Sequence, residues 1–145
     1  MSGKELGIRL IIFTTHDSPK HMQQTQVLTY GIDGVRAERL REVAQAQRFW
    51  LRETSQMSAC RNLLHTSPPS VFVLGLGGDL ERELALLEQV HASLPGTPTI
   101  VVCETDNPAL AGLAWDLGAT FALFPPTPAE RITELVAKLL PGPTP

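Results

Sequence analysis

From residue 25 onward, short apolar runs alternate with stretches in which apolar residues recur at helical spacing. Glycine, proline and acidic residues stand between many of these segments, as is typical of strand and helix ends. Strands that alternate with helices bury their apolar side chains as a parallel sheet with helices on both faces. The alternation therefore predicts an α/β fold built on a doubly wound parallel sheet.

The pattern contains five strand–helix units. The runs 71–74 and 99–103 are apolar throughout, which is typical of central strands buried on both faces. The segment 48–53 alternates less cleanly and is expected at a sheet edge. In full, we expect strands at 26–30, 48–53, 71–74, 99–103 and 121–124, and helices at 34–47, 57–65, 80–94, 108–117 and 128–139.

Several helix ends carry residues that cap helices well. Gly118 follows the fourth helical stretch and suits the left-handed conformation that often ends a helix. Residues 127–130, Thr-Pro-Ala-Glu, form a capping box at the start of the last helix. The other expected N-caps are Asp33, Asp79, and either Asp106 or Asn107.

The first 24 residues precede this alternating pattern. Residues 8–13 form one more apolar run, which predicts an extra strand that pairs at a sheet edge or is exchanged between subunits. His16, Asp17 and His21 follow it and suggest metal binding or general base chemistry, although polar loop residues are the simpler interpretation. We expect an N-terminal extension at 1–24, one domain at 25–140, and a proline-rich tail or linker at 141–145.

Composition narrows the function classes further. With a net charge of −3 and scattered basic residues, the chain of 145 residues shows no footprint for nucleic acid. It has no apolar run long enough to span a bilayer and no secretory signal layout. Cys60 and Cys103 lack metal-ligand spacing and are expected to be buried, reduced thiols. The sequence predicts a cytoplasmic protein with no metal and no cofactor.

Four segments together resemble the response-regulator receiver (CheY-like) domain: 71–75, 100–103, 117–119 and 124–126. The resemblance extends over residues 25–140. It implies a flavodoxin-like fold, in which five parallel strands are arranged in the order 2-1-3-4-5. The N-terminal strand would be an addition to that sheet.

The residues that carry receiver chemistry are replaced here. A receiver has a phosphoacceptor aspartate at the end of its third strand, acids that hold magnesium after the first strand, a hydroxyl residue ending the fourth and a lysine after the fifth. The corresponding residues are Gly75, Cys103 and Pro125, with Asp33 as the only carboxylate near the acid pair and Ala122 in place of the switch aromatic. The resemblance therefore implies a degenerate pseudo-receiver that does not take up phosphate.

Such a domain would act in two-component signalling as a protein–protein interaction module, without enzymatic activity. We expect a homodimer that docks through the fourth helix, fifth strand and fifth helix. If the proline-rich tail is a linker, the chain would be the N-terminal part of a larger regulator. Trp115 and Phe121 either form an exposed apolar patch there or fill the core beneath the last strand. The candidate interaction residues are Ala109, Gly112, Trp115, Asp116, Phe121 and Ala122.

A second hypothesis concerns the glycine-rich turn that follows the third strand. Backbone N–H groups at a helix N-terminus bind anions, so Gly77, Gly78 and Asp79 could hold a small anionic ligand. The spacing lacks the third glycine of the dinucleotide fingerprint and the lysine of the P-loop. A plain tight turn is the simpler interpretation. If an anion does bind there, the chain would be a small-molecule sensor instead of an interaction module.

Overall fold

The computed structural model describes residues 8–11, 25–126 and 128–141. Its six strands form one sheet in the order β1-β3-β2-β4-β5-β6. The strands are β1 (Ile8–Ile11), β2 (Gln26–Tyr30), β3 (Trp50–Thr54), β4 (Val71–Leu76), β5 (Thr99–Cys103) and β6 (Phe121–Leu123). The helices are α1 (Gly34–Gln47), α2 (Met57–Thr66), α3 (Leu80–Ser93), α4 (Pro108–Asp116) and α5 (Ala129–Leu139).

Strands β2 to β6 are all parallel and confirm the expected order 2-1-3-4-5. The extra strand β1 pairs antiparallel with β3, with Ile8 opposite Thr54 and Ile11 opposite Leu51. The expected N-terminal strand therefore lies at the sheet edge and pairs within its own chain. It also covers β3, which the sequence had placed at the edge.

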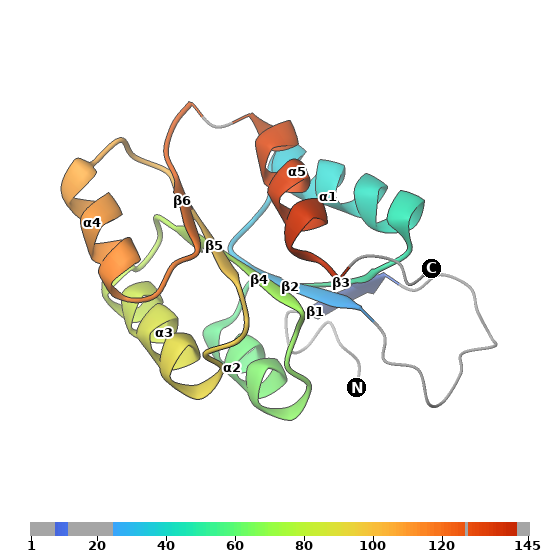
Figure 1. The fold of residues 1–145 in the computed structure, drawn as a ribbon, viewed down its shortest axis with the longest axis horizontal. Coiled ribbons are helices and arrows are strands. Elements are labelled where there is room, and N and C mark those ends of the chain that lie inside the picture. The colour runs from blue at the N-terminus through green and yellow to red at the C-terminus, as the bar shows by residue number, and fades with distance from the viewer. Residues whose placement is uncertain (1–7, 12–24, 127, 142–145) are drawn as a thin grey trace.

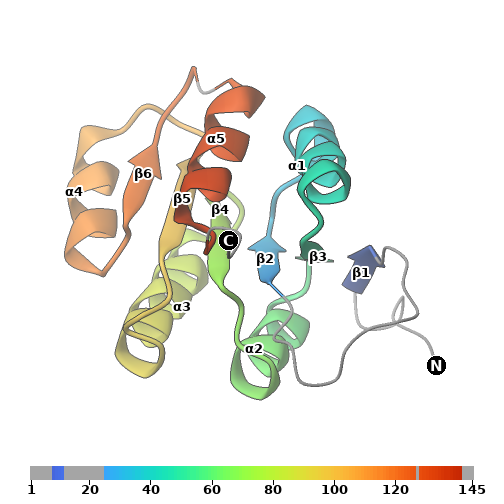
Figure 2. The ribbon, with the colours of Figure 1, turned by 45° about the vertical axis from the view of Figure 1, so that its right-hand side comes forward.

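Helices α1 and α5 cover one face of the sheet, and α2, α3 and α4 cover the other (Figures 1 and 2). Each face has its own apolar core. Strands β4 and β5 contribute to both cores, because every residue in them is buried. This confirms the interpretation of the two apolar runs as central strands.

The boundaries of three strands differ from the sequence expectation, and β6 ends at Leu123, one residue early. Strand β4 continues through Gly75 to Leu76, because these residues pair with Val102 and Cys103 of β5. The chain therefore turns after Leu76 and not at Gly75. Strand β3 begins at Trp50, since Arg48 ends helix α1 in the left-handed conformation (φ 61°).

The caps are partly as expected. The Asp79 carboxylate accepts a hydrogen bond from the Arg82 N–H at 3.4 Å, and the Asn107 side chain accepts from the Ala109 N–H at 3.0 Å. Asp33 stands at the N-cap of α1, but its side chain makes no capping hydrogen bond. The first residue of the expected capping box, Thr127, lies outside the described residues.

Two helices bury a different stripe from the expected one. Helix α3 buries Glu83 together with Leu86, Leu87 and Val90, while Leu80 at its start is exposed. In α4 the apolar spacing predicts a buried face of Leu110, Leu113, Ala114 and Leu117. Only Leu110 and Ala114 are buried, so the prediction was wrong for Leu113, which is 42% exposed. Among the described residues, no helix is long and apolar enough to cross a membrane.

Candidate functional site

The carboxyl ends of β2 and β4 border an open cavity of about 380 Å³. Ligands bind at this end of the sheet in open α/β folds. The cavity brings together several of the positions singled out in the sequence, which come from β2, β4 and the loops that follow them. Those positions are Asp33, Gly75, Gly77 and Gly78, and Glu83 and Glu104 also line the cavity.

Gly75 has no room for a side chain. A Cβ atom built on Gly75 would lie 2.5 Å from the carbonyl oxygen of Gly31 and 3.1 Å from its carbonyl carbon. Gly31 directly follows β2 and has a φ of +75°, a conformation that favours glycine. Two backbones therefore touch where a receiver domain would carry its phosphoacceptor side chain, and any larger residue there requires the backbone to move.

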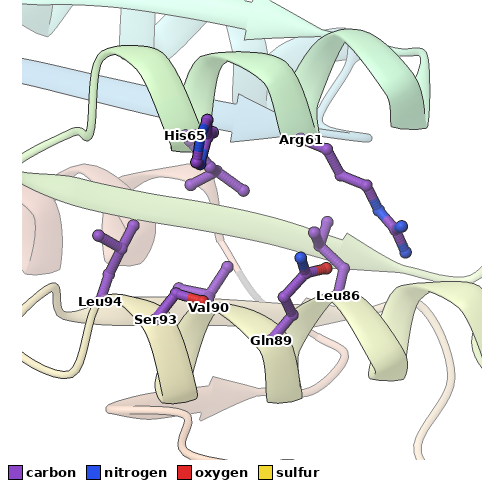
Figure 3. A pocket seen from close by; sticks show the side chains of 8 residues that line it. Arg61, His65, Leu86, Gln89, Val90, Ser93 and Leu94 are labelled. Carbon is purple, nitrogen blue, oxygen red and sulfur yellow. The ribbon is translucent and has the colours of Figure 1, made fainter.

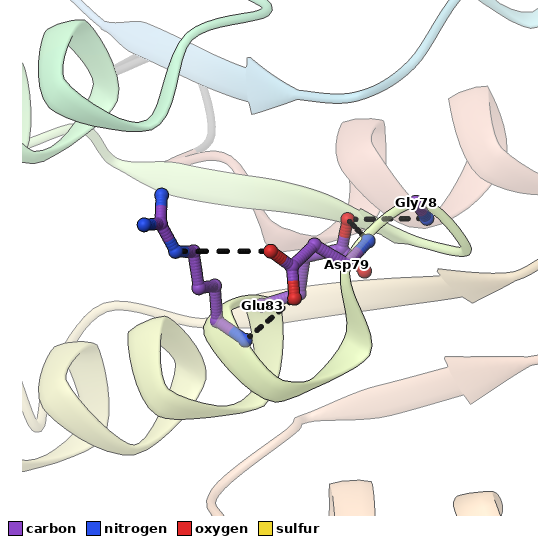
Figure 4. Close-up of polar contacts among 4 residues, drawn as sticks. Gly78, Asp79 and Glu83 are labelled. Atoms are coloured by element: carbon purple, nitrogen blue, oxygen red, sulfur yellow. Dashed lines mark hydrogen bonds and ion pairs between the residues drawn. The ribbon is translucent and has the colours of Figure 1, made fainter.

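The turn after β4 already holds a carboxylate. Glu83, which is 4% exposed, accepts hydrogen bonds from the backbone N–H groups of Gly77 at 3.0 Å, Gly78 at 3.3 Å and Asp79 at 3.0 Å. Figure 4 shows the Glu83 side chain reaching from the first turn of α3 to this loop. The N–H groups that could have held an external anion are thus bound to an anion of the protein itself.

The charge of the cavity also disfavours phosphate. Asp33, Glu83 and Glu104 line it, and none of the described residues that do so is basic. Arg36 lies nearby, where its guanidinium donates to the Glu104 carboxylate at 3.1 Å. A phosphate group in this cavity would be repelled by these carboxylates, and no cationic side chain among the described lining residues would bind it. In the described part of the chain, no cluster of His, Cys, Asp or Glu side chains is suited to hold a metal ion.

The other two positions that the resemblance assigns to the phosphorylation site lie apart from this cavity. Cys103 is fully buried at the end of β5, paired with Leu76, and Pro125 is half-buried after β6. Neither is among the residues that line the cavity. Burial raises the pKa of the Cys103 thiol to about 11, with a smaller contribution from Glu104. A protonated thiol is a weak donor and a poor nucleophile.

We expect both thiols to resist alkylation in the native protein. Burial raises the pKa of Cys60, like that of Cys103, to about 11, so only about one thiol in a thousand is ionised near pH 8. The reaction with iodoacetamide should be roughly 100-fold slower than in the guanidinium-unfolded protein, where the usual pKa of about 8.5 returns. Peptide mass spectrometry would follow each cysteine, and equal native and unfolded rates would contradict this expectation.

The candidate interaction face is only partly as expected. Trp115 is 50% exposed on α4, next to exposed Asp116, and Ala109 and Gly112 of the same helix are exposed as well. Phe121 is half-buried and packs against the core under α1 and α5, whereas Ala122 packs against the core on the other face. Each interpretation of the two aromatic residues is therefore right for one of them: Trp115 is a surface residue and Phe121 belongs to the core.

Three residues that shape these sites were not singled out from the sequence. No local sequence pattern shows that Gly31 contacts Gly75, because Gly31 follows β2 whereas Gly75 lies in β4, far along the chain. Glu83 carried a signal, since it occupies the apolar stripe of α3 three residues before Leu86. The apolar spacing of α4 assigns Leu113 to the core, but Leu113 is exposed, on a different side of the helix from Trp115. The set His16, Asp17 and His21 lies outside the described residues.

Comparisons with known proteins identify the fold. No family model and no curated protein matches this sequence. The structure is similar to a CheY-like receiver domain protein from Methanospirillum hungatei JF-1, with a TM-score of 0.69, 15% identity, and coverage of 81% of this chain and 94% of that chain. It is also similar to a response regulator receiver protein from Pseudomonas putida, with a TM-score of 0.67 and 22% identity. That match covers 81% of this chain and 98% of that chain.

A response regulator protein from Burkholderia pseudomallei, solved with a phosphorylated aspartic acid, has a TM-score of 0.63 and 18% identity. The match covers 79% of this chain and 72% of that chain. Likeness at these identities shows the fold alone. The chain has the CheY-like receiver fold, with an additional antiparallel strand β1 at one edge.

Proposed function

We propose that this chain is a pseudo-receiver: a signalling module that binds other proteins and accepts no phosphoryl group at the end of β4. The observation that carries this proposal is the backbone contact between Gly31 and Gly75, which leaves no space even for a Cβ atom. A lost aspartate alone could be restored by one substitution. Adding any side chain at position 75 also requires the backbone of Gly31 to move. This supports a domain whose phosphorylation chemistry is gone.

The hydrogen bonds of Glu83 support the same proposal and weigh against the small-molecule sensor at the Gly77–Asp79 turn. An anion could reach the three N–H groups only by displacing a buried carboxylate that already satisfies them. It would also meet the acidic lining formed by Asp33 and Glu104. No observation in the described part of the chain favours the sensor over the interaction module.

Beryllofluoride with magnesium, which mimics a phosphoryl group, tests the proposal directly. We expect ¹H–¹⁵N spectra of the chain to show no saturable shifts at residues 74–79 or 102–106 during the titration. The physical reason is the absence of a nucleophile, of a metal-binding cluster among the described residues, and of space at Gly75. Saturable shifts centred on Gly75 would refute the proposal, and a phosphorylatable receiver domain serves as the positive control.

We further propose that the module docks through α4 and the neighbouring edge strand β6. The exposed side of α4 carries Ala109, Gly112, Leu113 and Trp115, and Asp116 is the only charged residue of the helix. A helix that is apolar on all sides is normally covered on all sides. Strand β6 pairs only with β5 among the described strands, so its outer edge adjoins the same surface. These features support a homodimer in which the two α4 helices face each other.

We expect Trp115→Glu to weaken that dimer by roughly 30-fold or more, because buried tryptophans commonly dominate interface energies and a charge would have to be desolvated. Sedimentation velocity over a concentration series would measure the change. Val35→Glu is the matched control, since Val35 is 61% exposed on α1, on the opposite face of the sheet. A monomeric wild-type chain at all concentrations, or equal effects of both variants, would contradict homodimerisation through α4.

A further inference from the structure

A second cavity, separate from the degenerate site and from α4, lies between α2 and α3. Its volume is about 300 Å³, at the lower end of the range for small-molecule sites. Figure 3 shows its walls: Arg61 and His65 extend from α2 on one side, and Gln89 and Ser93 extend from α3 on the other. Within each pair the two residues are four positions apart, so both side chains lie on the helix face that borders the groove.

The floor of this groove is apolar. Leu64 of α2 and Leu86 and Val90 of α3 are buried in the core beneath it, and Leu94 closes the end beyond α3. A hydrophobic floor of this kind favours the ring or the short chain of an organic ligand, because the ligand's own apolar surface leaves water when it lies in the groove. The floor residues themselves contribute little to this effect, since each is at most 7% exposed. The polar side chains stand only around the rim.

The rim has the opposite charge character from the rest of the molecule. The chain has a net charge of −3, yet none of the described residues that line the groove is acidic. Arg61 forms no ion pair with any described carboxylate. In Figure 3 its side chain extends from α2 toward α3. A guanidinium with no ion-pair partner among the described residues offers paired donors in the planar geometry that suits a carboxylate.

From these observations we infer that the α2–α3 groove binds a small monocarboxylate with an apolar body. The apolar body lies on Leu64, Leu86 and Val90, and the carboxylate accepts hydrogen bonds from Arg61 at the rim. His65, Gln89 and Ser93 supply further donors around the head group. The ligand is small, because a cavity of about 300 Å³ holds one aromatic ring or a chain of about six carbons.

Titration of the full chain with benzoate, followed by ¹H–¹⁵N spectra at constant ionic strength, tests this assignment. We expect saturable shifts confined to residues 60–66 and 86–94, with a dissociation constant on the order of 1 mM for so small a ligand. Hexanoate distinguishes a chain from a ring as the preferred body, and saturation by either acid supports the site. Acetate has the charge without the body and should cause no saturable shift.

Benzyl alcohol and two variants isolate the role of Arg61. Arg61→Gln should weaken benzoate binding roughly five- to tenfold and leave the weaker binding of benzyl alcohol unchanged. Arg131→Gln on α5 makes the same change in net charge on the opposite face of the sheet and should have no effect. The inference is overturned if neither acid saturates these shifts, if benzyl alcohol binds as tightly as benzoate, or if Arg61→Gln leaves the benzoate affinity unchanged.

Discussion

Replacing Gly75 with alanine is expected to lower the free energy of unfolding by about 3 kcal/mol, the upper part of the range for overpacked cores. The added Cβ would stand 2.5 Å from the Gly31 carbonyl oxygen and 3.3 Å from the Ile32 side chain. The closest atom belongs to the backbone of Gly31, whose N–H donates to the Thr54 carbonyl of β3 at 3.2 Å, so it cannot rotate away as a side chain would. Urea unfolding followed by circular dichroism would measure the loss.

Gly96→Ala is the matched control. Gly96 has no atom within 4 Å of a built Cβ and no positive φ, so its replacement should change the stability by less than about 0.5 kcal/mol. Gly75→Asp should destabilise at least as much as Gly75→Ala and should still fail to bind beryllofluoride, because Pro125 and Cys103 supply neither cation nor hydroxyl. A stable Gly75→Ala protein would show that β2 and β4 separate easily and would remove the main support for a closed site.

The Glu83→Ala variant should lose about 3 kcal/mol of stability. The carboxylate accepts hydrogen bonds from three backbone N–H groups. Each hydrogen bond to a charged group contributes about 1.5–3 kcal/mol when water cannot replace it. Water from the adjoining cavity compensates part of this loss, which is why the expected total is below the sum of three such bonds. Faster amide hydrogen exchange at residues 77–79 should accompany the change.

Two further variants separate hydrogen bonding from helix propensity. Glu88→Ala changes an exposed glutamate of the same helix and should alter the stability by less than about 0.5 kcal/mol. Glu83→Gln keeps one accepting oxygen but places an NH₂ group near N–H donors, so we expect roughly half the loss of Glu83→Ala. Equal stability of Glu83→Ala and Glu88→Ala would mean that the turn does not depend on the buried carboxylate.

The two features lie at the end of the sheet where the resemblance to receivers places the phosphorylation chemistry. At the carboxyl end of the sheet, Gly31 and Gly75 bring two backbones into contact, and Glu83 satisfies the turn that follows. Both arrangements stabilise the carboxyl end of the sheet, where the resemblance places the phosphorylation site of a receiver domain. A side chain introduced at position 75 would therefore act against the packing of this end of the sheet.

Much of the fold follows from local sequence pattern. Strands β4 and β5 were predictable because a strand buried on both faces must be apolar at every position, and the caps at Asp79 and Asn107 were predictable because short polar side chains bind the first N–H groups of a helix. The parallel order 2-1-3-4-5 followed from the resemblance to receivers. The resemblance likewise assigned Gly75, Cys103 and Pro125 to the positions that carry phosphorylation chemistry in receivers.

Contacts between residues far apart in the sequence were decided only by the tertiary structure. Gly31 and Gly75 touch because β2 and β4 are neighbours, and no local pattern shows that distance. The sequence alone determined that the chain alternates strands and helices and has glycine at position 75. The three-dimensional packing decided that position 75 has no room for a side chain, that Glu83 occupies the anion-binding turn, and that Trp115 faces solvent while Phe121 is half-buried. The physical reason is that apolar periodicity selects which face of an element is buried, whereas close approach between elements depends on all their neighbours at once.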